Sequence, residues 1–310
     1  MIITVTMNPA IDKTIEIDVL LPGKLNRIQR VEYDVGGKGI NVSKTIKALG
    51  GRSIATGFLG GNAGNTIKTV LDSLQIQNDF IWGEGETRTN TKVVEQNGTV
   101  TELNEPGPVI TEKQVKELIG KLERYADERT LFVLAGSIPK GVDNGVYAEI
   151  IRIVHAKGAK VLLDADGEGF RKALQAGPDI IKPNRMELEE YAGSAHHLSE
   201  QELLCIARKI LGQGIGTVAV SMGESGAMMV RKGYEVKCPA LSVNAHSTVG
   251  AGDAMVAALA YAEESELGDE ETVRLCMAAS AGAVTTIGTK PPSGELIDRL
   301  KEQVIIEEIQ

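Results

Sequence analysis

The chain has 310 residues, with 33 Lys and Arg against 42 Asp and Glu, which gives a formal net charge of −9 at pH 7. Apolar residues make up 42% and charged residues 24%, which excludes a disordered or collagen-like chain. The acidic balance argues against a nucleic-acid partner but leaves a small anionic ligand open. No apolar run is long enough for a membrane helix, the N-terminus reads as a strand rather than a secretion signal, and the three cysteines lack CxxC spacing. We therefore expect a cytoplasmic protein with no membrane partner.

Short apolar runs alternate with amphipathic stretches along the chain. The runs predict buried strands at 2–5, 53–58, 130–135, 160–164, 179–182 and 217–220. The amphipathic stretches predict helices at 39–49, 65–74, 111–125, 144–156, 200–211, 248–262 and 270–286, and Thr111 with Gln114 fits a capping box. This alternation predicts an α/β fold, with a doubly wound, mostly parallel sheet and helices on both faces.

Three segments interrupt this pattern, at 14–19, 27–35 and 89–103. They alternate polar and apolar residues, which predicts half-exposed antiparallel strands, and Asn97-Gly98 predicts a hairpin turn. No repeat or linker divides the chain, so we expect one domain over 1–310, with a small β-sheet lid built from segments near 12–19, 27–36 and 88–104. Such a sheet can close over a site, form a homodimer contact, or do both.

The segment Ser247-Thr248-Val249-Gly250-Ala251-Gly252-Asp253 precedes an apolar helix. Backbone N–H groups at this helix start lack partners within the helix, and small residues leave them accessible, so the segment predicts an anion-binding site. A carboxylate beside a bound phosphoryl group repels it, so we expect Asp253 to accept a proton from an attacking hydroxyl. The alternative is an ordinary helix with an acidic first turn.

A second candidate segment runs from Asp179 to Glu187. Lys182 ends a strand, and ligands bind at the carboxyl ends of strands in open α/β sheets. Asn184 and Glu187 are three residues apart, a spacing that suits either a water-mediated Mg²⁺ site or a capping box and, by itself, favours the capping box.

Three further stretches complete the candidates. The glycine-rich turn 221–226 can hold a nucleotide or simply reverse the chain, the segment 36–41 opens a helix, and Asp12 can accept hydrogen bonds from two sugar hydroxyls. The sequence contains no GxxxxGK[ST] and no GxGxxG after the first strand, which argues against a P-loop enzyme and the simplest dinucleotide-binding fold.

Together and in this order, these stretches resemble the ribokinase/phosphofructokinase-B family of carbohydrate kinases over nearly the whole chain. Gly36–Asn41 is similar to the family's first signature and Thr248–Asp253 to its second. The resemblance implies a ribokinase-like fold with a β-sheet lid, ATP and Mg²⁺, and phosphoryl transfer to a sugar hydroxyl. An oxidoreductase and a regulatory nucleotide-binding protein without activity are the alternatives; the missing GxGxxG argues against the first and Asp253 against the second.

Two segments resemble one branch of that family. Thr4–Asp12 is similar to the branch that acts on phosphorylated ketohexoses, and Thr101–Pro108 is similar to its members that use fructose 1-phosphate. We therefore expect fructose 1-phosphate to be phosphorylated at O6, which gives fructose 1,6-bisphosphate and ADP, with tagatose 6-phosphate as the alternative substrate. Gly136 stands where another branch carries Arg, which argues against fructose 6-phosphate.

The resemblance also implies roles for individual residues. It makes Asp253 the general base and the amides of Gly250, Ala251, Gly252 and Asp253 the anion hole. It implies nucleotide contacts at Lys182, Asn184, Ser221, Gly223, Gly226 and Thr248, a water-mediated Mg²⁺ contact at Glu187, and sugar contacts at Asp12, Gly37, Lys38 and Asn41. For the phosphate that the sugar already carries, the candidates are Arg27, Lys38, Arg88 and Ser137, since basic groups suit phosphate.

Overall fold

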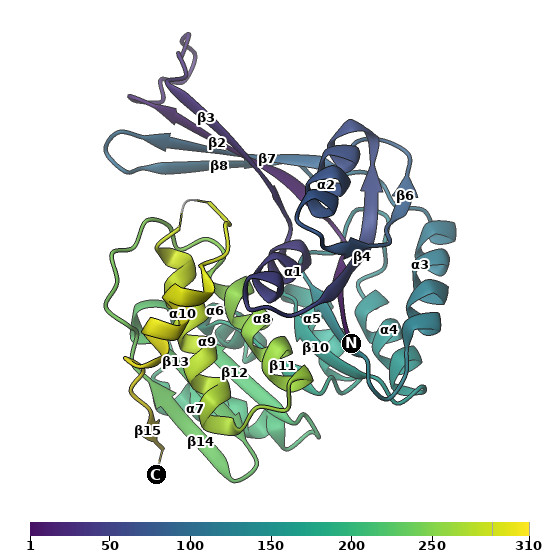
Figure 1. Cartoon of the computed structure of the whole chain (residues 1–310), viewed down its shortest axis with the longest axis vertical. Coiled ribbons are helices and arrows are strands. Elements are labelled where there is room, and N and C mark those ends of the chain that lie inside the picture. The colour runs from purple at the N-terminus through teal and green to yellow at the C-terminus, as the bar shows by residue number, and fades with distance from the viewer. Residues whose placement is uncertain (287, 310) are drawn as a thin grey trace.

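The computed structural model describes residues 1–286 and 288–309. Its central sheet has the strand order β15-β14-β13-β12-β11-β10-β9-β1-β4-β5, with β6 also paired to β4 (Figure 1). The strands are β1 (Ile2–Thr6), β4 (Ser53–Gly60), β5 (Gln77–Asn78), β6 (Ile81–Gly83), β9 (Leu131–Ala135), β10 (Lys160–Asp164), β11 (Ile180–Ile181), β12 (Thr217–Ser221), β13 (Ala227–Arg231), β14 (Tyr234–Cys238) and β15 (Glu307–Glu308). Pairing is parallel from β5 to β12 and antiparallel from β12 to β15. The predicted doubly wound, mostly parallel sheet is confirmed.

Helices cover both faces of this sheet because its side chains alternate between two cores. In β1, Ile3 and Val5 join one core and Ile2 joins the other. The first core is closed by α3 (Glu112–Tyr125), α4 (Val146–His155), α5 (Gly167–Leu174), α6 (Arg185–Tyr191) and α7 (Glu200–Leu211). The second is closed by α1 (Lys38–Ala48), α8 (Ala251–Glu264), α9 (Asp269–Val284) and α10 (Gly294–Lys301).

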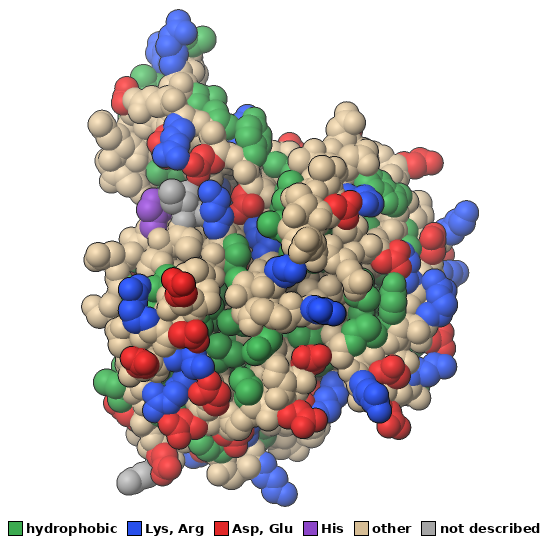
Figure 2. Space-filling view, viewed as in Figure 1, with side chains coloured by type: hydrophobic (Ala, Val, Ile, Leu, Met, Phe, Trp, Pro, Cys, Tyr) green, Lys and Arg blue, Asp and Glu red, His purple; other side chains and the backbone are tan. Residues whose placement is uncertain are grey.

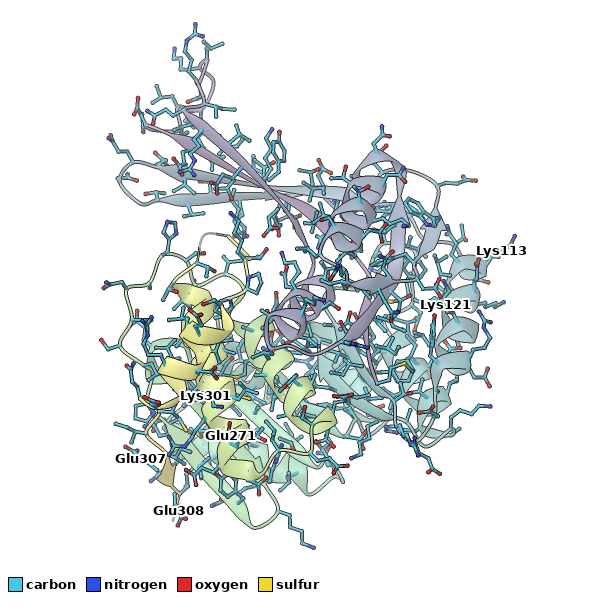
Figure 3. All side chains as sticks on the ribbon, in the orientation of Figure 1. Lys113, Lys121, Glu271, Lys301, Glu307 and Glu308 are labelled. Atoms are coloured by element: carbon cyan, nitrogen blue, oxygen red, sulfur yellow. The ribbon has the colours of Figure 1, made fainter. Side chains whose placement is uncertain are left out.

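Local contacts fix the ends of these layers. An ion pair between Lys301 and Glu271 joins α10 to α9 (Figure 3). The helix α2 (Gly61–Ser73) covers a third, smaller apolar cluster that includes Ile11 and Val35.

None of the described helices combines the length and the apolar character that crossing a bilayer requires.

A second sheet projects from the body of the molecule (Figure 1) and is called the lid sheet here. Its strand order is β3-β2-β7-β8, with β2 (Ala10–Ile17), β3 (Arg30–Gly36), β7 (Arg88–Glu95) and β8 (Val100–Asn104). The predicted hairpin at Asn97-Gly98 is confirmed, since Gly98 has a φ of 85° and its N–H donates to Glu95 O at 2.8 Å.

The prediction of an all-antiparallel lid sheet is wrong. Its two hairpins, β2–β3 and β7–β8, are antiparallel, but their shared central pair, β2 and β7, is parallel. The reason is topological: β2 follows β1 and β7 follows β6, and both preceding strands run in the same direction in the central sheet.

The lid sheet has one polar and one largely apolar face. Asp12 pairs with Asp34 and Asn90, and Thr14 pairs with Glu32 and Lys92, so these side chains share the polar face. Near the base of the lid sheet, the other face packs against α2 through Ile11 and Val35. Further out this face stays exposed, at Val31, Tyr33 and Leu103, and Figure 2 shows apolar side chains along the projecting sheet.

Candidate active site

The start of α8 provides an accessible set of backbone donors. Its N-cap, Gly250, has φ 87° and ψ −10°, a left-handed conformation that glycine adopts without strain. The first helical hydrogen bond runs from Ala254 N–H to Gly250 O, so the amides of Ala251, Gly252 and Asp253 precede it. Amides at a helix start attract anions through their free N–H groups and the helix dipole.

Asp253 lies buried in the first turn of this helix, with 9% of its surface exposed. Asn41 Nδ2, from α1, donates to Asp253 Oδ2 at 2.8 Å. Burial, with a contribution from the negative charge of Asp164, raises the pKa of Asp253 to about 6. A carboxylate with this pKa is ionised at neutral pH and has more affinity for a proton than an exposed Asp, as a general base requires.

Asp164 is the centre of the buried charges, and the sequence analysis missed it. It ends β10, next to β9 and β11, and is 1% exposed. Lys182 Nζ lies 3.1 Å from one of its carboxylate oxygens and Lys38 Nζ lies 3.4 Å from the other. Although burial opposes the charge, these two ammonium groups keep the pKa of Asp164 below its usual value. Its position at the carboxyl end of a parallel strand was the signal that could have found it.

The two lysines bring positive charge to the anion site. A Cβ built on Gly252 would lie 3.3 Å from Lys182 Nζ, so this ammonium group lies against the start of α8. Although burial opposes its charge, Asp164, Glu187 and Asp253 hold the pKa of Lys38 above its usual value. Lys38 is therefore charged, and both lysines have the chemistry to neutralise a phosphoryl group beside the helix start.

Asn184 and Glu187 form the capping box that their spacing favoured. Asn184 Oδ1 accepts from the Glu187 N–H at 2.9 Å, and Glu187 Oε2 accepts from the Asn184 N–H at 2.8 Å. Burial raises the pKa of Glu187, and the negative charge of Asp164 adds to this effect. A water-mediated metal contact by Glu187 stays a prediction.

The chemistry of these residues fits a magnesium ion that has few protein ligands. No group of three or more His, Cys, Asp or Glu side chains within residues 1–286 and 288–309 is arranged to hold a metal. Mg²⁺ in kinase sites is commonly held by one or two carboxylates, water and substrate phosphates, so Glu187 alone on the protein side is compatible with it.

The residues expected to contact the nucleotide lie on adjacent segments. Ser221 ends β12, its N–H donates to Pro183 O at 3.1 Å, and it bridges to Asn184. Gly223 and Gly226 flank the turn that follows, with φ of 58° and 89°. Thr248 is exposed in the loop before α8. The structure thus brings the 184 and 221–226 segments together, while their nucleotide contacts stay predictions.

The residues expected to contact the sugar lie at the base of the lid sheet. The Asp12 carboxylate lies against Gly36, where a Cβ would lie 2.2 Å from Oδ2, and Asn90 Nδ2 donates to Oδ1 at 3.3 Å. Burial raises the pKa of Asp12. Gly37 has a φ of 106° and accepts the Asn41 N–H through its carbonyl at 3.0 Å. The structure therefore connects Asp12 to Asp253 through the start of α1.

The four candidates for the existing phosphate lie on different segments, and their contacts with it stay predictions. Arg27 lies in the exposed loop between β2 and β3, so its expected place on a lid strand is wrong. Arg88 begins β7, and its guanidinium donates to Asn8 O and Glu105 O. Ser137 is half-buried just after β9, and Lys38 pairs with Asp164.

Comparison with known proteins agrees with this geometry. The family model for the pfkB family carbohydrate kinases matches residues 5–295. The chain is 34% identical to a 1-phosphofructokinase of Borreliella burgdorferi, covering 100% of this chain and 99% of that protein. It is 33% identical to a D-tagatose-1-phosphate kinase of Bacillus licheniformis, with 99% of both chains covered.

A solved structure is similar as well. Phosphofructokinase-2 of Escherichia coli, in complex with substrates and products, superposes with a TM-score of 0.92 at 26% identity, covering 97% of this chain and 98% of that one. The family match spans nearly the whole chain and includes both the lid sheet and the start of α8. This chain therefore belongs to the pfkB family of carbohydrate kinases.

Proposed function

We propose that this chain transfers a phosphoryl group from ATP to O6 of fructose 1-phosphate, which gives fructose 1,6-bisphosphate and ADP. The observation that carries the proposal is the buried carboxylate of Asp253 at a helix start, with Lys182 against the same start. This arrangement offers a proton acceptor and an anion site within one helical turn.

The chain's own groups account for the transfer. Asp253 takes the proton from the O6 hydroxyl as O6 forms its bond to the γ-phosphorus and the bond from that phosphorus to the leaving ADP oxygen breaks. The amides of Ala251, Gly252 and Asp253 stabilise the charge on the transferred group. Lys38 and Lys182 neutralise phosphate oxygens, while Asp164 holds both ammonium groups in place.

ATP and Mg²⁺ follow from the same proposal. The bridge between Asn184 and Ser221 supports a nucleotide site beside the anion site. Glu187 would hold Mg²⁺ through water. A bound Mg²⁺ ion supplies positive charge against the phosphate oxygens.

The choice of sugar rests on the relatives. A 1-phosphofructokinase is 34% identical over the full chain, which supports fructose 1-phosphate. The D-tagatose-1-phosphate kinase at 33% identity favours tagatose 1-phosphate as a second candidate. The two sugars carry their phosphate at the same carbon and differ in configuration at C4, so a contact near C4 must discriminate between them.

The apolar face of the lid sheet supports a homodimer. Exposed apolar residues gather on the lid sheet and its loops, with Tyr33 66% exposed and Leu25 78% exposed. A paired lid sheet would bury this surface and protect its edges. Sedimentation of the wild type should show a dimer, and Tyr33→Lys should shift it toward the monomer; a wild-type monomer at all concentrations would remove the dimer.

Two expectations accompany the proposed function. A single kinase domain over 1–310 with a closing lid is supported by the contact between the base of the lid sheet and α2. A cytoplasmic location is supported by the free thiols of Cys205, Cys238 and Cys276.

A coupled ADP-release assay over a panel of sugars tests the function. The panel contains fructose 1-phosphate, tagatose 1-phosphate, tagatose 6-phosphate, fructose 6-phosphate and fructose. We expect the highest kcat/KM for fructose 1-phosphate. A preference for another phosphorylated ketose would change the substrate but keep the reaction, whereas ATP binding with no sugar-dependent ADP release would overturn it.

A further inference from the structure

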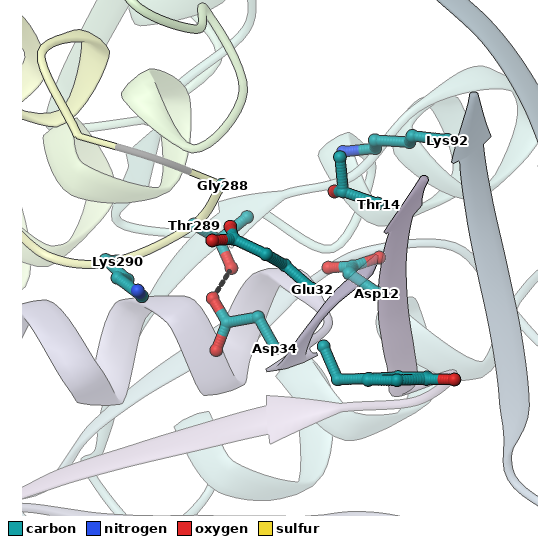
Figure 4. Close-up of a pocket in the computed structure, with 9 residues that line it drawn as sticks. Asp12, Thr14, Glu32, Asp34, Lys92, Gly288, Thr289 and Lys290 are labelled. Carbon is teal, nitrogen blue, oxygen red and sulfur yellow. Dashed lines mark hydrogen bonds between the residues drawn. The ribbon is translucent and has the colours of Figure 1, made fainter. Parts of the chain in front are cut away.

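A cavity of about 220 Å³ lies between the polar face of the lid sheet and the loop at residues 288–290 (Figure 4). Asp12 and Thr14 of β2, Lys92 of β7 and Lys290 of the loop line it. Lys92 extends from β7 toward Thr14, and Asp12 lies on the same side (Figure 4). The sequence analysis gave no role to Lys92.

Two of the five charged side chains that line this cavity are neutralised by close neighbours. Glu32 pairs with Arg30, and Asp34 accepts from Lys44 Nζ at 3.1 Å and from the Thr289 hydroxyl at 2.7 Å. Lys92, by contrast, has no carboxylate within 4.0 Å in the part of the chain that the structure describes. Within the described residues the cavity therefore offers two cations without a close ion pair, Lys92 on the lid sheet and Lys290 on the loop, and Lys92 attracts the Asp12 carboxylate only at longer range.

The other basic candidates are less free to bind an anion there. Three N–H directions of Arg88 already meet the carbonyls of Asn8 and Glu105. Lys38 is held by Asp164 near Asp253, where the transferred phosphoryl group is expected, and Arg27 lies in the exposed loop beyond the strands. Among these cations, Lys92 is the one that lines the cavity together with Asp12.

The order of contacts places Lys92 at the end of the site remote from the proton acceptor. Asp253 contacts Asn41, and Asn41 donates its N–H to Gly37. Gly36, the neighbour of Gly37, contacts the Asp12 carboxylate, and Lys92 lies two paired positions further out along the lid sheet than Asp12, on the same face. A sugar whose hydroxyls meet Asp12 and whose reacting hydroxyl meets Asp253 would direct its opposite end toward Lys92.

We propose that Lys92 binds the phosphate that the sugar already carries and thereby makes the enzyme select phosphorylated over free ketoses. The Thr14 hydroxyl, directly opposite on β2, provides a second donor. The proposal rests on the proposed function and adds to it that the recognised phosphate lies at the end of the sugar remote from the reacting hydroxyl. In fructose 1-phosphate, O1 and O6 are those two ends.

Lys92→Gln tests this role, with Lys92→Arg as the charge-retaining variant. Lys13→Gln is the matched control, because Lys13 lies on the opposite face of the same sheet, over the Tyr33 ring at 5.7 Å. We measure kcat/KM for fructose 1-phosphate and for fructose, and the affinity for fructose 1-phosphate by calorimetry without ATP.

Loss of a charge-assisted contact should lower both the affinity and the kcat/KM for fructose 1-phosphate by about 10- to 100-fold in Lys92→Gln. The kcat/KM for fructose and the KM for ATP should stay near wild type. Lys92→Arg should recover most of the lost kcat/KM and affinity. Lys13→Gln should leave the kcat/KM for both sugars unchanged.

The outcomes separate the two proposals. A wild type that uses fructose 1-phosphate, together with an unchanged Lys92→Gln, overturns the role of Lys92 and leaves the proposed function intact. Equal losses for both sugars also overturn it, since they indicate a structural effect on the lid sheet. A wild type that prefers another ketose phosphate overturns the proposed substrate. The role of Lys92 is then tested by comparing the kcat/KM of Lys92→Gln for that sugar phosphate with its kcat/KM for the free sugar. A wild type that prefers free fructose overturns both.

Discussion

The two halves of the candidate site differ in burial and in how their charges are paired. At the start of α8, Asp253, Asp164 and Lys182 are buried; Lys182 pairs with Asp164, and Asn41 donates a hydrogen bond to Asp253. On the lid sheet, Asp12 and Lys92 are half-exposed and face an open cavity. The first half is arranged before any ligand binds, whereas the second leaves charges that a sugar phosphate can complete.

This difference follows from where the strands lie. The strands that carry the buried half belong to a sheet with helices on both faces, so a charge there must be paired. The lid sheet has only α2 against the base of one face, so water can solvate its charges until substrate replaces it. Preorganised charge suits the chemical step, and an adaptable pocket suits substrate selection.

Among these variants, Asp253→Asn, in the buried half of the site, should have the largest effect on turnover. Without a proton acceptor, kcat should fall by about 10²- to 10⁴-fold, while ATP affinity stays close to wild type because the backbone donors and lysines remain. Steady-state assays measure the first and calorimetry the second. Asp72→Asn is the control, since that exposed carboxylate pairs with Lys68 on α2.

The pH profile provides a second view of the same group. As the pH falls below about 6, Asp253 takes up a proton and can no longer accept one, so the wild-type kcat should fall on the acid side. Asp253→Asn should lack this acid limb. Near-normal turnover in the variant would show that another group accepts the proton.

Asp164→Asn should have the next largest effect, on stability. Removing this carboxylate leaves Lys182 buried beside a neutral amide and Lys38 without its partner. Loss of one partner of a buried pair typically costs about 3–5 kcal/mol. Urea unfolding should show a lower midpoint with an unchanged m-value, and Asp72→Asn is again the control. An unchanged midpoint would mean that the lysines find other partners.

Asp253→Asn should also change stability, in the opposite direction to Asp164→Asn. The folded-state pKa of Asp253 is about 6, against an ordinary value of 3.8, so the ionised form destabilises the fold above pH 6. The difference corresponds to about 3 kcal/mol, and it disappears as the pH falls through 6 toward 4.

The variant carries no ionisable group at this position and should therefore melt at a higher temperature than the wild type at pH 7.5. At pH 4.5 the two proteins should differ much less. Thermal melts at both pH values measure this. A gain in Tm that is equal at both pH values would contradict a raised pKa as its cause.

The buried half was more predictable than the lid sheet. Gly250 and Asp253 share one short segment, and Asn184 and Glu187 of the capping box are three residues apart. Local spacing in the sequence was therefore enough to predict both features. Asp164 was missed because an Asp at a strand end resembles any strand boundary until its neighbours β9 and β11 are known. The β13–β14 hairpin was missed as well, although Gly233 (φ 80°) marks its turn.

The lid sheet depends on pairing between distant segments. Asp12 and Asn90 are separated by 78 positions yet lie opposite each other, and no local pattern specifies that β2 and β7 run parallel. The role of Lys92 depends on this register, because a shift by one residue would move its side chain to the other face.

Arg88→Ala, in the lid half of the site, should have the smallest effect of these variants. Arg88 braces the base of the lid sheet through the carbonyls of Asn8 and Glu105, and burial lowers its pKa. Only part of its guanidinium is left for a substrate phosphate, so kcat/KM for fructose 1-phosphate should fall about tenfold, less than for Lys92→Gln. The kcat/KM for fructose should fall by a smaller factor, which narrows the gap between the two sugars.

The losses of kcat/KM for fructose 1-phosphate and for fructose, compared with each other, show which role Arg88 has. Arg152→Ala is the matched control, because Arg152 is an exposed residue of α4 and does not line the cavity. Parallel kcat/KM measurements on the two sugars should show little change for this control. If Arg88→Ala lowers kcat/KM for both sugars equally, Arg88 acts only as a brace, and phosphate recognition in the lid half then falls to Lys92 and Thr14. A loss confined to fructose 1-phosphate would instead make Arg88 a second phosphate contact, two residues before Asn90 on the same face of β7.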